Sequence, residues 1–432
     1  MTAMRSTPRT DVFILVGGQG SRLSVLSEHR AKPAVPFAGK YRIIDFTLSN
    51  CVYSGLFRIY MLTQYRPRSL VEHVGIGKPW DLDRKWGGIS YLHPYLGYRG
   101  STWYGGTADA LVQNLNILHR SDAEEALILS GDHVYKMNYE LFLRSHREQG
   151  ADATVGVIEV PWDLTRHFGI MRCDESGRIV EFTEKPQEAK SNLASMGVYV
   201  FQREFLIELL ERLRPEHPNL DFGKHVIPSM VGTSNLATYR YGGYWLDIGT
   251  VESYFAANMD LLGDEPPLNL FDPKWHILTR EHNRPPTSIE PGASVQRSFI
   301  TDGCQIAGSV HGSVLGPGVV VEPGAVVRDS VLLDDCLVRR DARVERCIFD
   351  KRVRVGAAAR VGAREDGRAN EEQPDVLACG ITLVGQGARL PAHQRIGTNC
   401  LVGMHVGPED FRSRALADGT ALRTVHAEHP VR

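Results

Sequence analysis

Hydrophobic positions divide the chain into two parts with different periods. From residue 11 to about residue 263, short aliphatic runs alternate with longer segments in which apolar residues recur at helical spacing. The aliphatic runs predict buried strands at 12–16, 59–63, 126–129, 154–160 and 195–201, and the longer segments predict helices at 111–119 and 203–213. Strands that alternate with helices are typical of a mostly parallel sheet covered by helices. The first part is therefore expected to be an α/β domain.

From residue 289 onward, apolar residues recur every six positions instead. The steps run from Ile289 to Val295, from Val314 through Val320 to Val326, and from Val384 through Leu390 and Ile396 to Val402. A six-residue period does not fit a helix and is too regular for a sandwich, but it fits the hexapeptide coils of a parallel β-helix. A loop-rich β domain with accidental spacing is the alternative. Residues 364–375 break the period and are expected to leave one coil as a loop.

Two proline pairs lie between these parts and argue against a continuous helix across them. They are Pro266-Pro267 and Pro285-Pro286. The predicted organisation is an α/β domain over residues 1–262, a linker over 263–288, a β-helix over 289–405 and a C-terminal tail over 406–432.

Composition excludes several classes of protein. The 432 residues, enough for two or three domains, carry 49 Lys and Arg against 51 Asp and Glu, a formal net charge of −2. The chain has no long run of Lys or Arg, so its sequence does not indicate binding to nucleic acid or to a membrane surface. No apolar run approaches the ~20 residues of a membrane span. Met1–Asp11 does not resemble a signal peptide, and the seven cysteines form no C-x-x-C pair, so we expect a cytoplasmic protein with reduced thiols.

The first predicted strand runs directly into a glycine-rich turn. Residues 17–23 read Gly-Gly-Gln-Gly-Ser-Arg-Leu, and residues 30–36 read Arg-Ala-Lys-Pro-Ala-Val-Pro. Such a turn lets backbone N–H groups approach an anion, and Arg22 adds a planar donor fork suited to phosphate. Taken separately, the turn could be purely structural and Lys32 could be a solvated surface lysine. The pattern is neither G-x-G-x-x-G nor a P-loop, which argues against a dehydrogenase or a phosphate-loop ATPase.

Together these two motifs resemble the signature of the sugar-phosphate nucleotidyltransferases, and among them the ADP-glucose pyrophosphorylases of bacterial glycogen synthesis. Further matching motifs follow in order, at residues 41–46, 63–65, 103–110, 131–136, 182–186, 195–201 and 245–250. They cover nearly the whole first part, and this family also carries a hexapeptide part. The resemblance implies a Rossmann-like nucleotidyltransferase domain with a mostly parallel mixed sheet, followed by a left-handed parallel β-helix.

The resemblance also implies a reaction. The phosphate of α-D-glucose 1-phosphate attacks the α-phosphorus of ATP and releases pyrophosphate, which gives ADP-glucose, the first committed step of glycogen biosynthesis. Charge at the attacking and leaving oxygens must be neutralised. The family places Mg²⁺ on Asp132 and Asp247, and Arg22 and Lys32 on the β- and γ-phosphates, so that Arg22, Lys32 and Asp132 are the expected catalytic residues. Taken alone, each aspartate is more often a turn or helix-cap residue.

Other positions match the two substrate sites of the family. The glucose 1-phosphate positions, with Lys185 on the phosphate and Glu184 on the sugar, are Tyr104, Gly169, Glu184, Lys185 and Ser195. The ATP positions are Gly17, Gly18, Gly20, Ser21, Gln64 and Gly105. Tyr104 alone could be a core aromatic. His133 is expected to be structural, because the nucleophile is already an anionic phosphate.

Three positions depart from the family pattern. Gln19 stands where many relatives have Arg, Gly105 where relatives often have Arg or Gln, and His29 where some bacterial relatives place an activator-binding Lys. The family implies a homotetramer regulated by a sugar phosphate or a nucleotide. These departures leave the effector, and the choice between dimer and tetramer, unassigned.

Two alternatives stay open. One is a related pyrophosphorylase that uses UTP, dTTP or another sugar phosphate. The other is a non-catalytic regulatory paralogue, which tends to lose its metal aspartates or its glycine-turn arginine. Because Asp132, Asp247, Arg22, Lys32 and Lys185 are all present, the sequence argues against the paralogue.

Overall fold

The computed structural model describes residues 9–18, 20–94, 103–362 and 367–424. The chain divides into two compact units. We call residues 1–18 with 46–245 the sheet unit, and residues 19–45 with 246–432 the β-helix unit. No helix in the described part of the chain is both long enough and apolar enough to cross a membrane.

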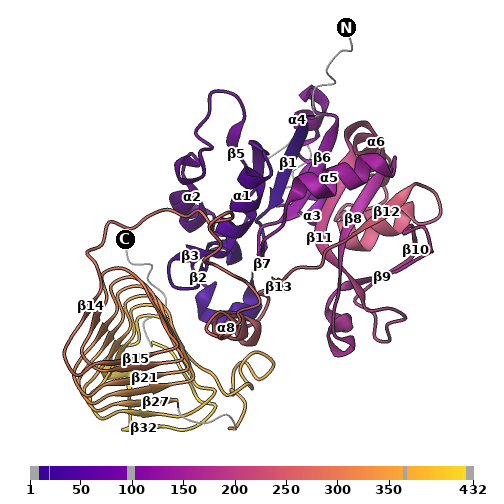
Figure 1. The fold of residues 1–432 in the computed structure, drawn as a ribbon. Coiled ribbons are helices and arrows are strands. Elements are labelled where there is room, and N and C mark those ends of the chain that lie inside the picture. Colours follow the sequence, from indigo (N-terminus) through magenta and orange to yellow (C-terminus); the bar gives the residue numbers. More distant parts are fainter. Residues whose placement is uncertain (1–8, 19, 95–102, 363–366, 425–432) are drawn as a thin grey trace. The chain divides into compact units, whose positions relative to one another are not determined.

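The sheet unit is built on a nine-stranded mixed sheet (Figure 1). Its path is β10-β9-β11-β6-β1-β4-β5, and β8 pairs with both β11 and β12. The strands are β1 Thr10–Leu15, β4 Arg58–Leu62, β5 Gly88–Leu92, β6 Glu125–Ser130, β8 Ala153–Glu159, β9 Gly169–Cys173, β10 Ile179–Glu184, β11 Leu193–Gln202 and β12 Leu236–Arg240. The central strand β1 is parallel to β4 and β6, and its aliphatic run is buried, as in sheets covered on both faces. Each of the five predicted strands coincides with a strand of this sheet.

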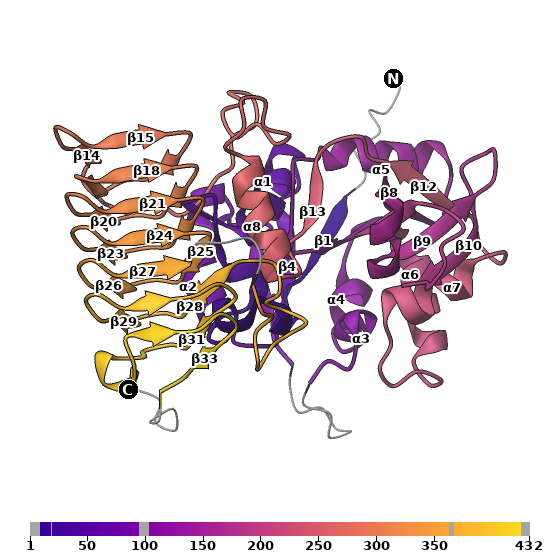
Figure 2. The ribbon, with the colours of Figure 1, turned by 90° about the horizontal axis from the view of Figure 1, so that it is seen from below.

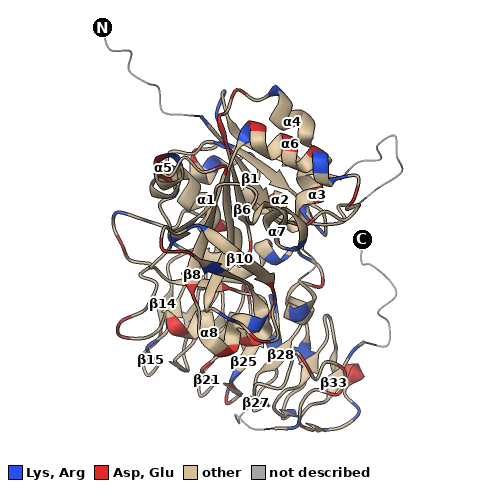
Figure 3. Cartoon of the chain, turned by 90° about the vertical axis from the view of Figure 1, so that its right-hand side faces the viewer, with Lys and Arg blue, Asp and Glu red and all other residues tan. Residues whose placement is uncertain are grey.

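Helices cover this sheet. The α-helices of the described residues are α1 Ile43–Tyr53, α2 Arg68–Val74, α3 Thr107–Val112, α4 Leu115–Arg120, α5 Tyr139–Glu148, α6 Arg203–Leu213 and α7 Ile227–Met230, together with α8 Val251–Asp260 of the β-helix unit. Leucines of α3, α4 and α6 join one hydrophobic core with residues of β6 and β11, while α5 and α6 carry charges of both signs (Figure 3). The predicted helix 203–213 is confirmed as α6. The predicted helix 111–119 is divided, because Asn114 leaves the helical region at φ −117° and its side-chain amide donates to the carbonyl of Ala110 at 2.8 Å.

The β-helix unit contains three parallel sheets, which form the faces of a left-handed β-helix (Figure 2). The first sheet holds β14 Ser288–Ile289, β17 Gln305–Ile306, β20 Val320–Val321, β23 Leu337–Val338, β26 Arg354–Val355 and β29 Arg389–Leu390. The second holds β15 Ser294–Gln296, β18 Ser309–His311, β21 Val326–Arg328, β24 Arg343–Glu345, β27 Arg360–Gly362, β30 Arg395–Ile396 and β32 Ala415–Leu416. The third holds β16 Phe299–Ile300, β19 Val314–Leu315, β22 Val331–Leu332, β25 Cys347–Phe349, β28 Thr382–Val384, β31 Leu401–Val402 and β33 Ala421–Leu422.

Each strand of a coil buries one aliphatic residue, as β23 does with Val338 and β24 with Val344, so buried positions recur about every six residues along the chain, and the same positions of successive coils stack in register. Val310 pairs with Val327, Val327 with Val344, and Val344 with Val361, and all four are buried. The hexapeptide prediction is thus confirmed, and the loop-rich alternative is excluded. The predicted excursion falls between β27 and β28, and of its residues 364–366 lie outside the described part. Strands β32 and β33 extend two of the sheets into residues that we expected to form the tail.

Residues 20–45 precede most of the sheet in sequence but belong to the β-helix unit. They contain the short helices Ser21–Leu26 and Lys32–Ala34, and the hairpin of β2 (Pro36–Phe37) and β3 (Tyr41–Arg42). Helix α8 anchors this segment, since the Tyr254 hydroxyl donates to the carbonyl of Pro36 at 2.7 Å and the amide of Ala38 donates to the side chain of Asn258 at 3.0 Å. The domain limits expected along the chain stay predictions.

Candidate active site

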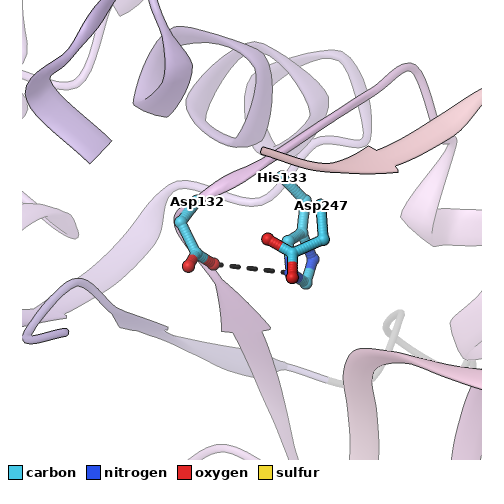
Figure 4. Close-up of side chains that lie close together, drawn as sticks. All are labelled: Asp132, His133 and Asp247. Atoms are coloured by element: carbon cyan, nitrogen blue, oxygen red, sulfur yellow. Dashed lines mark ion pairs between the residues drawn. The ribbon is translucent and has the colours of Figure 1, made fainter. Parts of the chain in front are cut away.

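Asp132 lies in the short turn that follows the buried strand β6, in the sheet unit. The Ser130 hydroxyl donates to its carboxylate, and the His133 Nε2 lies 3.5 Å from its Oδ1 (Figure 4). The His133 ring packs edge-on against Trp245, with ring centroids 5.1 Å apart. His133 opens β7 (His133–Tyr135), and Trp245 opens its partner strand β13 (Trp245–Asp247). His133 is thus held between the Asp132 carboxylate and an aromatic ring.

Glu184 occupies a narrow slot between two glycines. It ends β10 and pairs in register with Gly169 of β9. A Cβ atom on Gly169 would lie 2.9 Å from the Glu184 Oε2, and a Cβ atom on Gly223 would lie 2.7 Å from the same oxygen. Burial raises the pKa of the Glu184 carboxyl, the charge of Asp221 raises that pKa further, and Lys185 opposes the shift. The slot therefore requires glycine on both walls and presents a half-buried oxygen acceptor.

Lys185 lies in the bend directly after β10, and Ser195 lies on β11. The Lys185 ammonium is 3.7 Å from the Glu184 Oε1, and its side chain is 60% exposed, so a phosphate can reach it. Its backbone has a φ of 49°, a strained value for a residue other than glycine. The Ser195 hydroxyl accepts from the amide of Gly197 at 3.2 Å and lies 3.4 Å from the Tyr199 hydroxyl.

Tyr104 lies mostly within the core. Its ring is part of the hydrophobic cluster, and its hydroxyl donates to the carbonyl of Leu92 at 3.3 Å. The carbonyl of Tyr104 accepts from the side-chain amide of Gln64 at 3.2 Å. A Cβ atom on Gly17 would lie 3.0 Å from the Cβ of Gln64, whereas Gly18 has open space around it. The structure thus brings Gly17, Gln64 and Tyr104 together; Gln19 lies outside the described residues.

Gly105 has a packing reason to be glycine. A Cβ atom there would lie 2.2 Å from the Asn219 side-chain oxygen, and one on Gly106 would lie 2.3 Å from the carbonyl of Leu220. The Gly105 amide donates to Asp109 at 2.9 Å. Asn219 therefore packs directly against Gly105. An Arg or Gln at position 105, as relatives often have, would displace the segment that carries Asn219.

The predicted phosphate-binding cations lie together in the β-helix unit. The Lys32 ammonium is buried and donates to the Asp247 Oδ1 at 2.7 Å. A Cβ atom on Gly249 would lie 3.2 Å from an Arg22 guanidinium nitrogen and 3.3 Å from the Asp247 Oδ2. Gly20, at a φ of 64°, brings its backbone against Lys32, since a Cβ atom there would lie 3.0 Å from the Lys32 Cβ. Lys32 and Arg22 thus flank the Asp247 carboxylate beside the glycine turn. Ser21 of that turn is exposed.

Three described residues carry groups that could hold a metal ion, namely Asp132, His133 and Asp247 (Figure 4). The Asp132 and Asp247 side chains are 27% and 26% exposed, so solvent and ions reach both carboxylates. Carboxylate oxygens suit a hard divalent cation such as Mg²⁺, whereas an imidazole suits softer metals. The oxygen donors of Asp132 and of Asp247 are therefore each of the kind that a hard divalent ion prefers.

Sequence reasoning missed three residues of these clusters: Gly223 on the wall of the Glu184 slot, Gly249 beside Arg22, and Trp245 under His133. Gly249 and Trp245 lie inside the matched motif 245–250, which was an available signal. Gly223, which follows Asp221-Phe222, carried no signal in the sequence, because it matters only through its close approach to the Glu184 side chain.

Comparisons with known proteins agree with this architecture. A family model described as nucleotidyl transferase matches residues 12–264, and one described as GlmU-like, C-terminal hexapeptide matches residues 287–384. A glucose-1-phosphate adenylyltransferase of Thermomicrobium roseum is 51% identical over 96% of this chain and 97% of its own length. Proteins of the same name from Thermotoga maritima (48%, over 95% of this chain and 97% of the relative) and Acetivibrio thermocellus (47%, over 93% and 94%) are also similar.

Proposed function

Because the chain belongs to the nucleotidyl transferase family, we propose that it transfers the adenylyl group of ATP to α-D-glucose 1-phosphate and releases pyrophosphate. The observation that carries this proposal is the cluster of Arg22 and Lys32 around Asp247, beside the glycine turn. Two fixed cations there suit a polyphosphate leaving group. The product, ADP-glucose, supplies glycogen synthesis.

The residues divide the chemistry between the two ends of the reaction. Lys32 is already held by Asp247, so it loses little freedom when it binds the β- and γ-phosphates, and Arg22 adds a second donor fork. At the other end, Lys185 grips the phosphate of glucose 1-phosphate and Glu184 accepts a hydrogen bond from a sugar hydroxyl. Since the attacking phosphate is anionic, no residue need act as a general base, and His133 keeps its packing role beside Asp132.

Members of this family generally use a divalent metal, and we propose that here it is Mg²⁺, held by Asp132 and Asp247. When bound, Mg²⁺ supplies positive charge to the phosphate oxygens at both ends of the displacement. The oxygen donors of the two aspartates support this choice over a softer ion.

The nucleotide preference is the first test. With Mg²⁺ and glucose 1-phosphate, the purified chain is expected to release pyrophosphate fastest from ATP. The assay is run in parallel with UTP, dTTP, GTP and CTP under the same conditions. A clear preference for any of these over ATP would favour the related pyrophosphorylase, and absence of turnover with all five would favour the regulatory paralogue.

Lys185→Ala is expected to raise the KM for glucose 1-phosphate by about 10- to 100-fold, the usual value of a charge-assisted hydrogen bond, with the KM for ATP little changed. Alanine shares the strain of the positive φ with lysine, so the variant removes the ammonium and leaves the backbone comparable. Lys190→Ala is the matched control, because Lys190 is exposed and pairs with Glu181 instead. An effect confined to ATP would mean that the two phosphate sites are exchanged.

We further propose that the protein acts in the cytoplasm as a homotetramer regulated by a sugar phosphate or a nucleotide. All seven cysteines are free, which suits a reducing compartment. Size-exclusion chromatography with light scattering tests the tetramer against a dimer, and the pyrophosphate assay with added metabolites identifies the effector.

A further inference from the structure

A buried ion pair joins the Lys32 segment to the β-helix. The Arg30 guanidinium donates two parallel hydrogen bonds to the Asp350 carboxylate, both at 2.9 Å. A third runs from Arg30 to the side-chain oxygen of Gln386 at 3.1 Å. The side chain of Arg30 is 6% exposed and that of Asp350 is fully buried. Bidentate pairing of this kind fixes the direction of the guanidinium as well as its distance.

Asp350 is itself held in place by the β-helix. It directly follows β25, and its amide donates to the carbonyl of Val384 at 2.9 Å. Its Oδ1 also accepts from the amide of Lys351 at 2.7 Å. Parallel pairing of β25 with β22 and β28 fixes this backbone within the stack. The carboxylate is therefore a rigid anchor.

Only Ala31 separates Arg30 from Lys32, and the backbone over residues 31–35 is held in a short hydrogen-bonded turn. Pro33 fixes one dihedral, the amide of Ala34 donates to the carbonyl of Ala31 at 2.9 Å, and the amide of Val35 donates to that of Lys32 at 3.0 Å. A movement of Arg30 would therefore carry Lys32 with it. The Lys32 ammonium is fixed from its other end by Asp247.

We propose that Asp350 is a positioning residue for the adenylyl transfer: by clamping Arg30, it holds Lys32 where the leaving pyrophosphate is bound. The inference rests on the proposed function for the role of Lys32. It gives the β-helix an indirect part in catalysis, through a residue 318 positions after Lys32 in the sequence, as the difference 350 − 32 gives. The alternative is that the pair only stabilises the fold.

The primary test is Asp350→Ala, with Asp350→Asn as the variant that keeps the volume and is the less disruptive to folding. We expect kcat to fall by about 100-fold in Asp350→Ala, the scale of a 1 Å misplacement of a catalytic group, and less in Asp350→Asn. The KM for glucose 1-phosphate should stay unchanged, because Glu184 and Lys185 belong to the sheet unit. Unchanged kcat in both variants would overturn the proposal.

Asp335→Ala is the matched control. Asp335 is also an aspartate of the β-helix in an ion pair, 2.8 Å from Arg284, but it does not contact the Lys32 segment among the bonds of the described residues. We expect wild-type kcat in this variant. A loss equal to that of Asp350→Ala would show that any weakened β-helix lowers turnover, and would overturn the proposal.

A double variant, Arg30→Met with Asp350→Leu, separates positioning from stability. Apolar residues of similar volume often replace a buried ion pair without loss of stability, but they lack its directional hydrogen bonds. We expect the thermal midpoint to recover in the double variant and kcat to stay low. Recovery of kcat together with the midpoint would mean that the pair is only structural.

Hydrogen exchange gives a readout that does not require activity. In Asp350→Asn, the amides of Ala34 and Val35 should exchange at least about tenfold faster than in the wild type or in Asp335→Ala, because local opening becomes easier. Equal protection in all three would overturn the proposal. If the wild type itself produced no ADP-glucose, the proposed function would fail, and this exchange measurement would still decide whether Asp350 positions the Lys32 segment.

Discussion

Asp132→Asn is expected to lower kcat by about 1,000-fold while the protein stays folded. The change replaces a carboxylate with a neutral amide of almost the same volume, so it weakens the proposed Mg²⁺ ligand without opening a cavity. The amide can still bond the Ser130 hydroxyl, which now donates to Asp132, so the turn after β6 should persist. Steady-state pyrophosphate release at saturating ATP and glucose 1-phosphate measures the loss, and circular dichroism reports the fold.

Asp163→Asn serves as its control. Asp163 is an exposed aspartate in the first turn of the short helix Trp162–His167, away from the proposed ligands in sequence. Wild-type kcat is expected in the control over a range of Mg²⁺ concentrations. Near-normal kcat in Asp132→Asn would contradict the metal assignment, and rescue of that variant by excess Mg²⁺ would support it.

Lys32→Met is expected to lower kcat by about 100- to 1,000-fold, the usual cost of removing one donor that stabilises a developing anion. The KM for ATP should change less, because Arg22 and the glycine turn still bind the phosphates. Methionine keeps the length of the buried side chain and removes its charge. Measuring the reverse reaction as well tests whether the affinity for pyrophosphate falls in parallel.

The control for this variant is Lys78→Met, since Lys78 is exposed and lies in the short helix Lys78–Trp80. An increase in the KM for ATP with unchanged kcat would show that Lys32 binds the ground state and the transition state equally. That result would remove Lys32 from the catalytic residues while leaving it in the ATP site.

The local pattern of hydrophobic residues predicted which helices and strands form better than it predicted where they begin and end. The period of six predicted the β-helix because each strand of a coil buries one aliphatic residue, as Val338 and Val344 of successive strands show. The helix expected over 111–119 failed at Asn114, whose side chain competes for a backbone carbonyl. The spacing of hydrophobic residues does not reveal such a hydrogen bond between a polar side chain and the backbone.

The site residues were predicted from motifs, and their roles stay predictions. Arg22, Lys32 and Asp247 do come together, and so do Glu184, Lys185 and Gly169. Tyr104 is buried in a hydrophobic cluster, and its place in the glucose 1-phosphate site stays a prediction. Gly223 could not be found, because its role depends on a side chain 39 positions earlier, as 223 − 184 gives.

By itself, the sequence determined the two architectures, the family and the candidate chemistry, because hydrophobic periods and short motifs are local properties of the chain. Only the tertiary structure decided that residues 20–45 fold with the β-helix, that Arg30 is clamped by Asp350, and that Gly105 faces Asn219. These are contacts between distant segments. Such contacts depend on how the folded chain brings segments far apart in the sequence side by side, and neither hydrophobic periodicity nor composition contains that information.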